Sequence, residues 1–566
     1  MIKKWVFKDL PSENEVEDLS KQLSIHPSLS QLLLQRKIDS FDKAKSFFRP
    51  TLESLHDPFE MKGMEKAVER LTNAIFQNEK ILIYGDYDVD GTTSVALVYN
   101  FFKSLSSNLF TYIPDRYTEG YGVSKKGIQW AIDHEIKLMI CLDCGIQAIN
   151  TIGLAKENNL DVIICDHHLP GDELPQALAI LDPKQDDCTY PYKELSGCGI
   201  GFKLLEGFSI QNGIETEKLY ANLDLVAVSI ASDIVPITGE NRVLAYFGLK
   251  KLNAEPIAGL AALIERASLN QPMSISDVVF GIGPRINAAG RINHAKTALD
   301  LLTQTNKEDA RVFAEKLNVE NKERKSYDES ITKEALQMIV DEGQIQNSST
   351  VLFKKDWHKG VIGIVASRCI EHFFKPTIVL TESTDVITGS ARSVEGFDVH
   401  AAISKCKKHL IQFGGHRYAA GLTMEKKNLK KFKDAFEEAV AESIKEEQKI
   451  PKIVIDLEID FDQIDFAFNN ILKQMGPFGP QNMQPIFCSR NVTLKKDARL
   501  LKEKHLKLFV DQNSSGNAFD VIGFGLGSFY DMLDKPFDMV YTIEENHFRG
   551  ETSLQLNLKD IAIKQQ

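Results

Sequence analysis

Residues 81–91, Ile-Leu-Ile-Tyr-Gly-Asp-Tyr-Asp-Val-Asp-Gly, decide the fold of this chain, because a short apolar run ends there in three carboxylates. Two later apolar runs end in the same way. Residues 138–142 lead into Asp143-Cys144-Gly145, and residues 162–165 lead into Asp166-His167-His168. The intervals between the runs have helical sequence patterns. Strands that alternate with helices predict an α/β fold with a parallel sheet and helices on both faces.

The ends of these three strands are expected to form one polar crevice, because ligands of an open parallel sheet bind beyond the carboxyl ends of its strands. Asp86 and Asp88 are two residues apart, so in extended backbone they point to the same side. Several carboxylates in one crevice repel one another strongly. Two divalent metal ions remove that conflict and suit an in-line displacement at phosphorus. Carboxylate and imidazole ligands favour Mn²⁺, with Mg²⁺ or Zn²⁺ as alternatives.

Within this crevice we expect Asp143 to bridge the two ions, His167 to bind one of them, and His168 to meet a phosphate oxygen. Each position alone has a plainer interpretation, since an Asp at a strand end commonly caps a helix. A single His is commonly a partly buried side chain with its own hydrogen bonds. Asp90 precedes Gly91, and its sequence context fits a metal ligand and a turn or capping residue equally well. Three successive strand ends of this kind favour the metal site.

Composition excludes several classes of protein. The 566 residues are 43% hydrophobic and 26% charged, with a formal net charge of −12. These fractions exclude a mainly disordered or fibrous chain. The net acidity excludes a protein that coats nucleic acid through uniform positive charge. It leaves a nucleic-acid enzyme possible, because binding depends on where Lys and Arg cluster.

The cysteines and the lack of long apolar runs predict a cytoplasmic protein. The chain has eight cysteines, mostly within apolar runs, which predicts free thiols in a reducing cytoplasm. Cys141 and Cys144 have the spacing of a redox or zinc pair, but no second pair accompanies them, so buried thiols are favoured. No run of about 18 apolar residues predicts a membrane span, and the N-terminus lacks the apolar core of a signal peptide.

Sequence patterns divide the chain into five parts. Residues 1–75 predict a helical lead-in, residues 76–304 an α/β catalytic domain, and residues 344–447 a second α/β domain. Residues 305–343 are polar with thinly spread apolar positions, which predicts a solvent-bridging helix between the two domains. Residues 448–566 have short alternating strands with turn residues between them, a pattern typical of a small β-barrel or sandwich.

Four ordered motifs, GDYDVDG, LDCG, DHH and ASDIVP, resemble those of the DHH phosphoesterase superfamily, and FGGHRYAAG resembles a motif of its associated domain. The segments WHKGVIGIVASR, GSARSVEGFDVH, GPRINAAGR and MGPFGPQNMQPIF are similar to the RecJ family. The resemblance covers the chain from about residue 50 to its end. It implies a DHH catalytic domain, a DHH-associated domain and a C-terminal OB-fold. It also implies a single-strand-specific 5′→3′ DNA exonuclease that releases 5′-mononucleotides in recombination and repair.

The resemblance also implies site residues. It implies metal ligands at Asp86, Asp88, Asp143, His167 and Asp233. The last follows a helix-like stretch and would otherwise be interpreted as a cap. We assign catalytic roles to Asp166, His167 and His168. The resemblance further implies substrate contacts at Arg116, Ser390, Arg392 and His416.

Local sequence gives these contacts a physical basis. Arg116 precedes glycines that permit a tight loop near a phosphate. Ser390 and Arg392 are two apart on a predicted strand, so they face the same way and suit a 5′ phosphate. The alternative is that Arg392 forms an exposed ion pair and Ser390 caps a helix. The glycines before His416 either approach an anion or form a plain turn, and Ala419-Ala420-Gly421 suggests a helix start.

Three residues of the segment GPRINAAGR have two interpretations of equal weight. Arg285, Asn287 and Arg291 either contact bases or the DNA backbone, or only hold a loop in place. Leu82 marks a departure from superfamily members outside RecJ, which often have His there. This leaves one metal short of a nitrogen ligand, so we expect the two sites to differ in affinity.

Two basic windows predict where a strand of DNA binds. Residues 402–433 contain nine Lys or Arg and one acidic residue. Residues 490–507 lie in the predicted barrel, where a basic face with aromatic residues is a usual single-strand platform. The candidates there are Lys495, Lys496, Arg499, Lys502 and Lys504. Both windows otherwise predict only a solvated surface. The expected partners are single-stranded DNA, a helicase and a single-strand-binding protein, with no membrane.

Two other functions fit parts of the sequence. A DHH phosphodiesterase that acts on cyclic dinucleotides or short oligonucleotides would usually be shorter and lack the barrel. A non-catalytic DHH-type DNA scaffold would have lost metal ligands, whereas all five predicted ligands are present.

Overall fold

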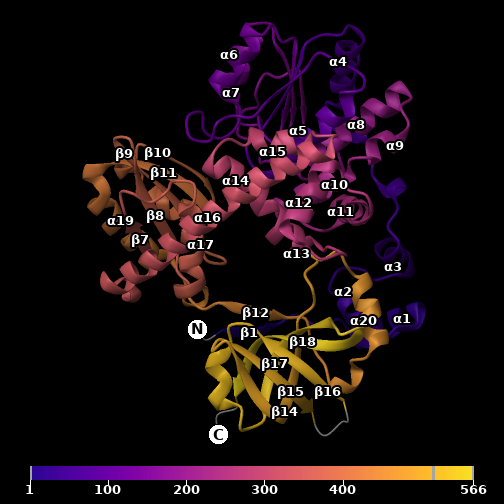
Figure 1. Ribbon diagram of the computed structural model, residues 1–566, viewed down its shortest axis with the longest axis vertical. Helices are drawn as coiled ribbons and strands as arrows, with labels where there is room; N and C mark the ends of the chain where they lie inside the picture. The colour runs from indigo at the N-terminus through magenta and orange to yellow at the C-terminus, as the bar shows by residue number, and fades with distance from the viewer. Residues whose placement is uncertain (1–2, 513–516, 564–566) are drawn as a thin grey trace. The chain divides into compact units, whose positions relative to one another are not determined.

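The computed structural model describes residues 3–512 and 517–563. They form two compact units, and Figure 1 labels most of their helices and strands. The larger unit comprises Lys8–Glu320 and Asp456–Gln566. The smaller unit comprises Asn321–Ile455 and the N-terminal residues up to Phe7.

A five-stranded parallel sheet lies in the larger unit, in the order β3-β2-β4-β5-β6. Its strands are β2 (Ile81–Gly85), β3 (Leu109–Tyr112), β4 (Leu138–Leu142), β5 (Asp161–Cys165) and β6 (Ala179–Leu181). β2, β4 and β5 are the three predicted strands, and their last residues are neighbours in register. The predicted parallel α/β sheet is therefore confirmed, whereas the sequence patterns did not indicate β3 and β6.

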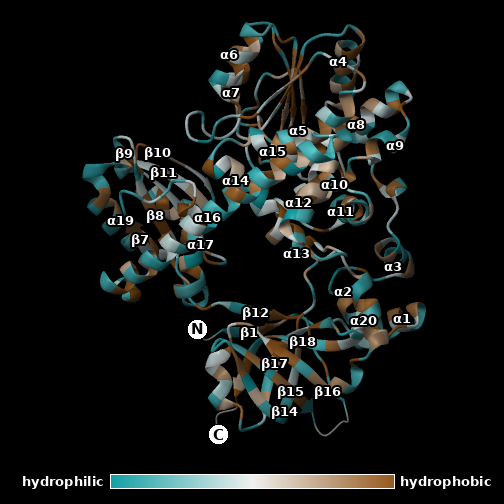
Figure 2. Ribbon diagram, viewed as in Figure 1, coloured by the Kyte–Doolittle hydropathy of each residue, from teal (hydrophilic) through white to brown (hydrophobic). Residues whose placement is uncertain are grey.

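Helices cover both faces of this sheet. On one face, α4 (Met64–Phe76), α5 (Val89–Phe102) and α8 (Gly197–Asn212) pack with Ile81 and Ile83. On the other face, α6 (Lys125–Asp133) and α7 (Ile149–Glu157) pack with Leu82 and Tyr84. Burial on both faces explains why the strands are continuous apolar runs, which are brown in Figure 2.

Apart from this sheet, residues 8–302 of the larger unit are mainly helical. The remaining helices are α1 (Glu13–Leu23), α2 (Pro27–Leu34), α3 (Phe41–Phe48), α9 (Thr216–Tyr220), α10 (Leu223–Ser232), α11 (Gly239–Ala254), α12 (Ala258–Ala267), α13 (Ile275–Asp277), α14 (Gly283–Ile292) and α15 (Lys296–Leu302). The predicted long helix is α16 (Lys307–Asp341), 35 residues in length. Leu317 of α16 joins the core of the larger unit, and Ile339 joins a core of the smaller one.

The smaller unit has a mixed five-stranded sheet in the order β10-β11-β9-β8-β7. Its strands are β7 (Thr350–Phe353), β8 (Thr377–Ser383), β9 (Val386–Arg392), β10 (Gln412–His416) and β11 (Ala419–Glu425). Its helices are α17 (Ile362–Phe373), α18 (Val399–Lys405) and α19 (Leu429–Ser443). A separate parallel pair joins β1 (Lys4–Phe7) to β12 (Lys452–Ile455).

Two local predictions were wrong. Ala419-Ala420-Gly421 begins β11 and not a helix, because these small residues pair with both β9 and β10. Lys4–Phe7 forms a strand and not part of a helical lead-in, because it pairs with β12. That partner lies far away in the sequence, so local patterns do not indicate the strand.

The C-terminal strands of the larger unit form the predicted barrel. They are β13 (Leu457–Glu458), β14 (Phe487–Leu501), β15 (His505–Gln512), β16 (Ala518–Gly523), β17 (Phe537–Phe548) and β18 (Glu551–Ile563). The sheet order is β13-β14-β15-β16-β18-β17, and pairing of β14 with β17 closes it. α20 (Phe466–Gln474) contributes to its core. Among the described residues, no helix has both the length and the hydropathy to cross a membrane.

Candidate metal centre

The predicted ligands lie together beyond the carboxyl ends of three strands. Asp86 follows β2, Asp143 follows β4, and Asp166-His167 follow β5, and all four are buried. The backbone N–H of Asp143 donates to the carbonyl of Cys165 at 2.9 Å, which holds one strand end against the next. Asp143 has a φ of +58°, a conformation that few residues other than glycine adopt.

His167 is the centre of this cluster. Its Nε2 lies 3.2 Å from Oδ1 of Asp143 and 3.5 Å from Oδ2 of Asp233, which follows α10. Two sets of residues each bring their ligand atoms within 4.8 Å of one another, and both sets include His167. One set is Asp143, His167 and His168, and the other is Asp90, His167 and Asp233. The structure therefore brings Asp233, which motif resemblance alone had suggested, to the strand ends.

Asp90 is part of the cluster and also part of its framework. Its Oδ2 lies 3.8 Å from Nε2 of His167. Its carboxylate also accepts from the N–H groups of Gly197 and Cys198, at 2.7 and 2.9 Å, and from the Ser229 hydroxyl at 2.6 Å. These bonds join the first turn of α5 to the start of α8 and to α10. Both interpretations of Asp90 thus have a structural basis.

Asp86 and Asp88 lie at the edge of the cluster and outside both sets. Oδ1 of Asp86 accepts from the N–H of Gly122 at 3.4 Å. Oδ1 of Asp88 caps α5 through the N–H of Gly91 at 3.0 Å. Both carboxylates act on Asp143, because their charges help to raise its pKa.

Burial and mutual repulsion hold these carboxyls above their ordinary pKa range. Burial is the main cause for Asp86, Asp88, Asp143 and Asp233, and each also gains from a neighbouring carboxylate. Burial lowers the pKa of His167 to about 4, so its imidazole is neutral. A neutral imidazole among crowded carboxylates has the charge and the donor atoms of a divalent-metal site.

Unpaired atoms give a second test of that fit. Oδ2 of Asp86 and both ring nitrogens of His167 are buried, and none has a hydrogen-bond partner in the described part of the chain. Buried polar atoms without a partner are costly and rare in folded proteins. Metal ligation would satisfy Asp86 Oδ2 and one His167 nitrogen, so the residues present fit a metal ion.

Asp166 has a different position from the other acids. Its carboxylate accepts from the N–H groups of Ile146, His167 and His168, and its Oδ1 lies 2.7 Å from Nδ1 of His168. Burial acts against the charged forms, but this pair lowers the pKa of Asp166 to about 2 and raises that of His168 to about 9. The pair leaves a charged, half-exposed His168 beside the cluster.

Tyr121 was not found from the sequence. Its hydroxyl lies 3.0 Å from Nε2 of His168 and 3.4 Å from the carbonyl oxygen of Asp143. Gly120 and Gly122 on either side have φ values of +84° and +82°, which allow the tight loop. The glycines of the Arg116 loop were the only available signal for Tyr121.

Arg116 lies on the same loop, with its guanidinium 4.9 Å from the ring centroid of Tyr87. Glu119 fixes the loop, because its carboxylate accepts from the N–H of Asp115 and from the hydroxyls of Tyr112 and Ser124. Tyr87 lies between Asp86 and Asp88, so Arg116 is close to the cluster.

The three predicted residues of α14 lie near the metal loop. A Cβ on Gly290 would lie 2.9 Å from the carbonyl oxygen of Tyr87, so α14 packs directly against that loop. Arg285 donates to the carbonyl of Gly281 at 2.6 Å, which supports a structural role. Asn287 is half-buried, and the Arg291 carbonyl accepts from the Tyr117 hydroxyl.

Ser390, Arg392 and His416 lie on one sheet of the smaller unit. Nη1 of Arg392 donates to the Ser390 hydroxyl at 2.9 Å, so the two side chains do face the same way. Ala419 of β11 pairs with Arg392 on one side and with His416 on the other. Residues paired across a sheet share a face, and a small Ala between them leaves that face open.

The basic residues of the barrel are exposed on β14 and on the turn after it. Lys495, Lys496 and Arg499 are on the strand, and Lys502 and Lys504 are near the turn. The Lys496 ammonium lies 4.6 Å from the ring centroid of Phe509. Lys495 lies 3.5 Å from Asp511, so part of its charge is offset.

Comparison with known proteins agrees with this geometry. The DHH family N-terminal domain matches residues 80–230, the DHHA1 domain residues 345–442, and the RecJ OB domain residues 455–560. The single-stranded-DNA-specific exonuclease RecJ of Bacillus subtilis is 35% identical over 98% of this chain and 70% of its own length. That of Escherichia coli is 32% identical over 97% of each chain. The chain belongs to the RecJ family.

Solved RecJ structures match the same fold. RecJ from Thermus thermophilus in complex with Mn²⁺ has a TM-score of 0.86 and 25% identity, over 100% of this chain and 80% of that one. A structure of exonuclease RecJ bound to manganese has a TM-score of 0.61 and 30% identity, over 69% and 96% of the two chains. The predicted succession of DHH, DHH-associated and OB folds in this RecJ-family chain is thus confirmed.

Proposed function

We propose that this protein is a single-strand-specific 5′→3′ DNA exonuclease that releases 5′-mononucleotides by metal-dependent hydrolysis, in recombination and repair. One observation carries the proposal. Buried carboxylates and a neutral His167, with unpaired Asp86 Oδ2 and His167 ring nitrogens, lie at three strand ends of a RecJ-family fold. Such a cluster has little structural value without a cation, because its charges repel.

The proposed metal ligands are Asp86, Asp88, Asp143, His167 and Asp233, with Asp90 as a further candidate. Two divalent ions bound there, preferably Mn²⁺ or alternatively Mg²⁺, would activate water and neutralise charge on the phosphate. Asp143 and His167 take part in the same set of close ligand atoms, and Asp233 joins through His167.

His168 is proposed to donate to an oxygen of the scissile phosphate. Asp166 holds the imidazole from Nδ1, which leaves Nε2 for the substrate or for Tyr121. A charged donor that is already oriented stabilises the developing negative charge without reorganisation. Arg116 is proposed to contact a second phosphate oxygen, while Arg285, Asn287 and Arg291 support or contact the strand.

The Ser390, Arg392 and His416 face is proposed to bind the 5′ end of the strand. A hydroxyl and a guanidinium that already contact each other present several donors to one phosphate. The basic residues of β14 and its turn are proposed to bind the single strand farther from the cleaved end.

We further propose a helicase and a single-strand-binding protein as partners, because a strand-specific enzyme needs unpaired DNA. A cytoplasmic location is proposed from the thiols, since all eight cysteines are free and buried.

End-labelled oligonucleotides test this function. A 5′ label should leave as a mononucleotide at once, while a 3′ label should persist in a ladder of shortening strands. Mn²⁺ or Mg²⁺ should support the reaction, EDTA should stop it, and blunt duplex should resist it. Earlier release of the 3′ label would contradict the polarity, and equal digestion of duplex would contradict strand specificity.

A further inference from the structure

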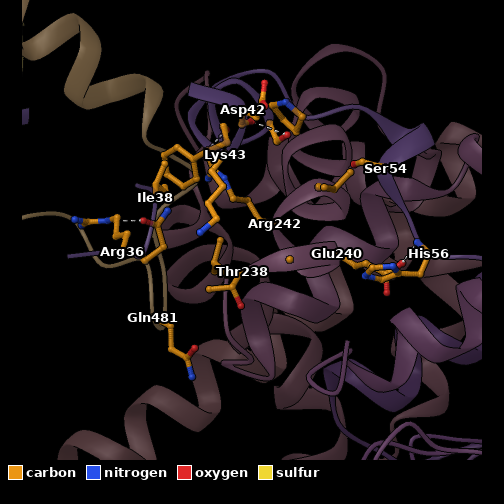
Figure 3. Close-up of a pocket in the computed structure, with 17 residues that line it drawn as sticks. Arg36, Ile38, Asp42, Lys43, Ser54, His56, Thr238, Glu240, Arg242 and Gln481 are labelled. Carbon is orange, nitrogen blue, oxygen red and sulfur yellow. Dashed lines mark hydrogen bonds between the residues drawn. The ribbon is translucent and has the colours of Figure 1, made fainter. Parts of the chain in front are cut away.

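A second polar pocket lies in the larger unit, outside the metal cluster. It encloses about 510 Å³ between α3, the start of α11 and the segment that contains Gln481 (Figure 3). That volume is within the range of small-molecule sites. Ile38, Phe47 and Ile237 supply its apolar walls, and its charged walls carry more positive than negative groups.

Arg242 is the unusual residue of this pocket. Its side chain is only 6% exposed, and its Cζ lies 3.8 Å from the centroid of the Phe47 ring. Nη2 donates to the Phe47 carbonyl at 2.9 Å. Nε and Nη1 are buried and have no hydrogen-bond partner among residues 3–512 and 517–563. A buried guanidinium with unused donors is costly unless an acceptor meets it.

The charge around Arg242 is not balanced by the protein. Arg36, a second wall of the pocket, uses Nε, Nη1 and Nη2 on Asn482, Leu32 and Met483. Among the described residues, no carboxylate forms an ion pair with either arginine, and the charge of Asp456 acts on Arg36 only from a distance. Burial, together with the charge of Arg36, lowers the pKa of Arg242 to about 10.

The acidic residues of the pocket do not offset this charge. Glu240 lies 3.2 Å from the ammonium of Lys203 and accepts from the Tyr190 hydroxyl and the N–H of His56. Figure 3 shows Glu240 directed toward His56 and away from Arg242. Asp42 is exposed on α3.

The first turn of α11 adds backbone donors to the same wall. Thr238 precedes the helix, and its side chain does not cap it but lies 3.1 Å from the Tyr192 hydroxyl. Thr238, Gly239 and Glu240 all line the pocket beside Arg242. An uncapped 16-residue helix with a guanidinium at its first turn attracts anions.

We propose that this pocket binds a phosphate group, with Arg242 as its principal ligand and the backbone at the start of α11 as a further donor. The group belongs either to a free phosphate monoester, such as a 5′-mononucleotide, or to the backbone of a DNA strand. The site is separate from the metal cluster and does not depend on the proposed function.

Isothermal titration of the full-length chain in metal-free buffer tests this site. The probes are inorganic phosphate, deoxycytidine 5′-monophosphate, the dinucleotide d(CpC) without terminal phosphate, and the neutral nucleoside deoxycytidine. The parent combines His168→Ala, Arg116→Ala and Arg392→Ala, which removes the other phosphate contacts proposed above, beside the metal cluster and on the Ser390 face. Inorganic phosphate should bind this parent at one site per chain, and the nucleoside should not bind.

Arg242→Gln in that parent should weaken phosphate binding at least tenfold, and Arg242→Lys should weaken it less. Arg49→Gln is the matched control, because Arg49 ends α3, donates to a carbonyl and does not line the pocket. It should leave binding unchanged. Thermal melting checks that each variant folds, and Arg242→Lys decides the role of Arg242 if the Gln variant does not.

The two sources give different results, and both support a phosphate site. Binding of the monophosphate alone assigns the site to a free phosphate monoester, and equal binding of d(CpC) assigns it to the DNA backbone. Failure of this parent to bind phosphate would overturn the proposal. Wild-type affinity in folded Arg242→Gln or Arg242→Lys would also overturn it.

Discussion

Nδ1 of His168 lies 2.7 Å from Oδ1 of Asp166, although the two residues are separated by only one position in the chain. The same carboxylate accepts hydrogen bonds from three backbone N–H groups, which fix its position at the end of β5. Asp166 thereby fixes the direction of the imidazole and favours its charged form.

Asp166→Asn should therefore lower kcat by about 10- to 100-fold, as is typical when an orienting partner of a functional side chain is removed. The affinity for Mn²⁺ should change far less, because Asp166 belongs to neither set of close ligand atoms. Steady-state cleavage and Mn²⁺ titration measure the two effects. Asp133→Asn, on the exposed face of α6, is the control. A large loss of metal binding with unchanged kcat would assign Asp166 to the metals instead.

Gly290→Ala should impair the metal loop from a distance. The added Cβ would lie 2.9 Å from the Tyr87 carbonyl, and backbone cannot yield as a flexible side chain can. We expect about tenfold weaker Mn²⁺ binding and slower cleavage in a folded protein. Gly153→Ala on α7 is the matched control, since nothing lies within 4 Å of its Cβ. Equal behaviour of the two variants would show that the close packing of α14 does not position the loop.

Asp224 should make stability depend on pH. Burial raises its pKa to about 6, although the N–H groups of Ile257 and Leu225 act against that rise. The folded state thus binds the proton more tightly than the unfolded state, whose pKa is near 3.8. The resulting stabilisation is complete below about pH 4 and is lost as the pH rises through 6.

Asp224→Asn does not titrate, so wild type should lose roughly 3 kcal/mol of unfolding free energy relative to this variant between pH 4 and pH 8. Urea unfolding at several pH values measures the difference. Asp172→Asn, which replaces an exposed carboxyl, should show no such trend. A constant difference between wild type and Asp224→Asn would contradict the raised pKa.

The basic residues of β14 and its turn should determine the salt dependence of single-strand binding. If all five contact phosphates, their replacement by Gln should reduce the slope of log affinity against log salt by up to about 3.5. The variant replaces Lys495, Lys496, Arg499, Lys502 and Lys504. The control replaces five exposed lysines elsewhere, Lys21, Lys45, Lys66, Lys156 and Lys250. Equal slopes for both sets would remove the barrel from the binding surface.

The strand ends were predictable because their chemistry is local. Asp86, Asp143 and His167 each follow an apolar run directly, and parallel pairing then brings the runs level. The same logic placed Ser390 and Arg392 on one face, since residues two apart on a strand share a face. Asp233 needed resemblance, because nothing near α10 in the sequence says that this helix ends at the sheet edge.

The remaining features depend on contacts between distant segments. Asp90 contacts His167 and also holds the start of α8, a dual position that no local pattern encodes. The strand at Lys4–Phe7 requires a partner near residue 452. Likewise, the pocket around Arg242 forms from three separate stretches, and no local pattern indicates that they meet.

The central claim is that the Asp143–His167 cluster is a catalytic metal site, and Asp143→Asn tests it most directly. We expect cleavage of a labelled single strand in Mn²⁺ to fall at least about 100-fold, and the rise in melting temperature that Mn²⁺ causes to shrink. Binding of the strand in metal-free buffer should stay within about twofold of wild type. Cleavage at the wild-type rate, with the Mn²⁺ effect on melting intact, would contradict the account.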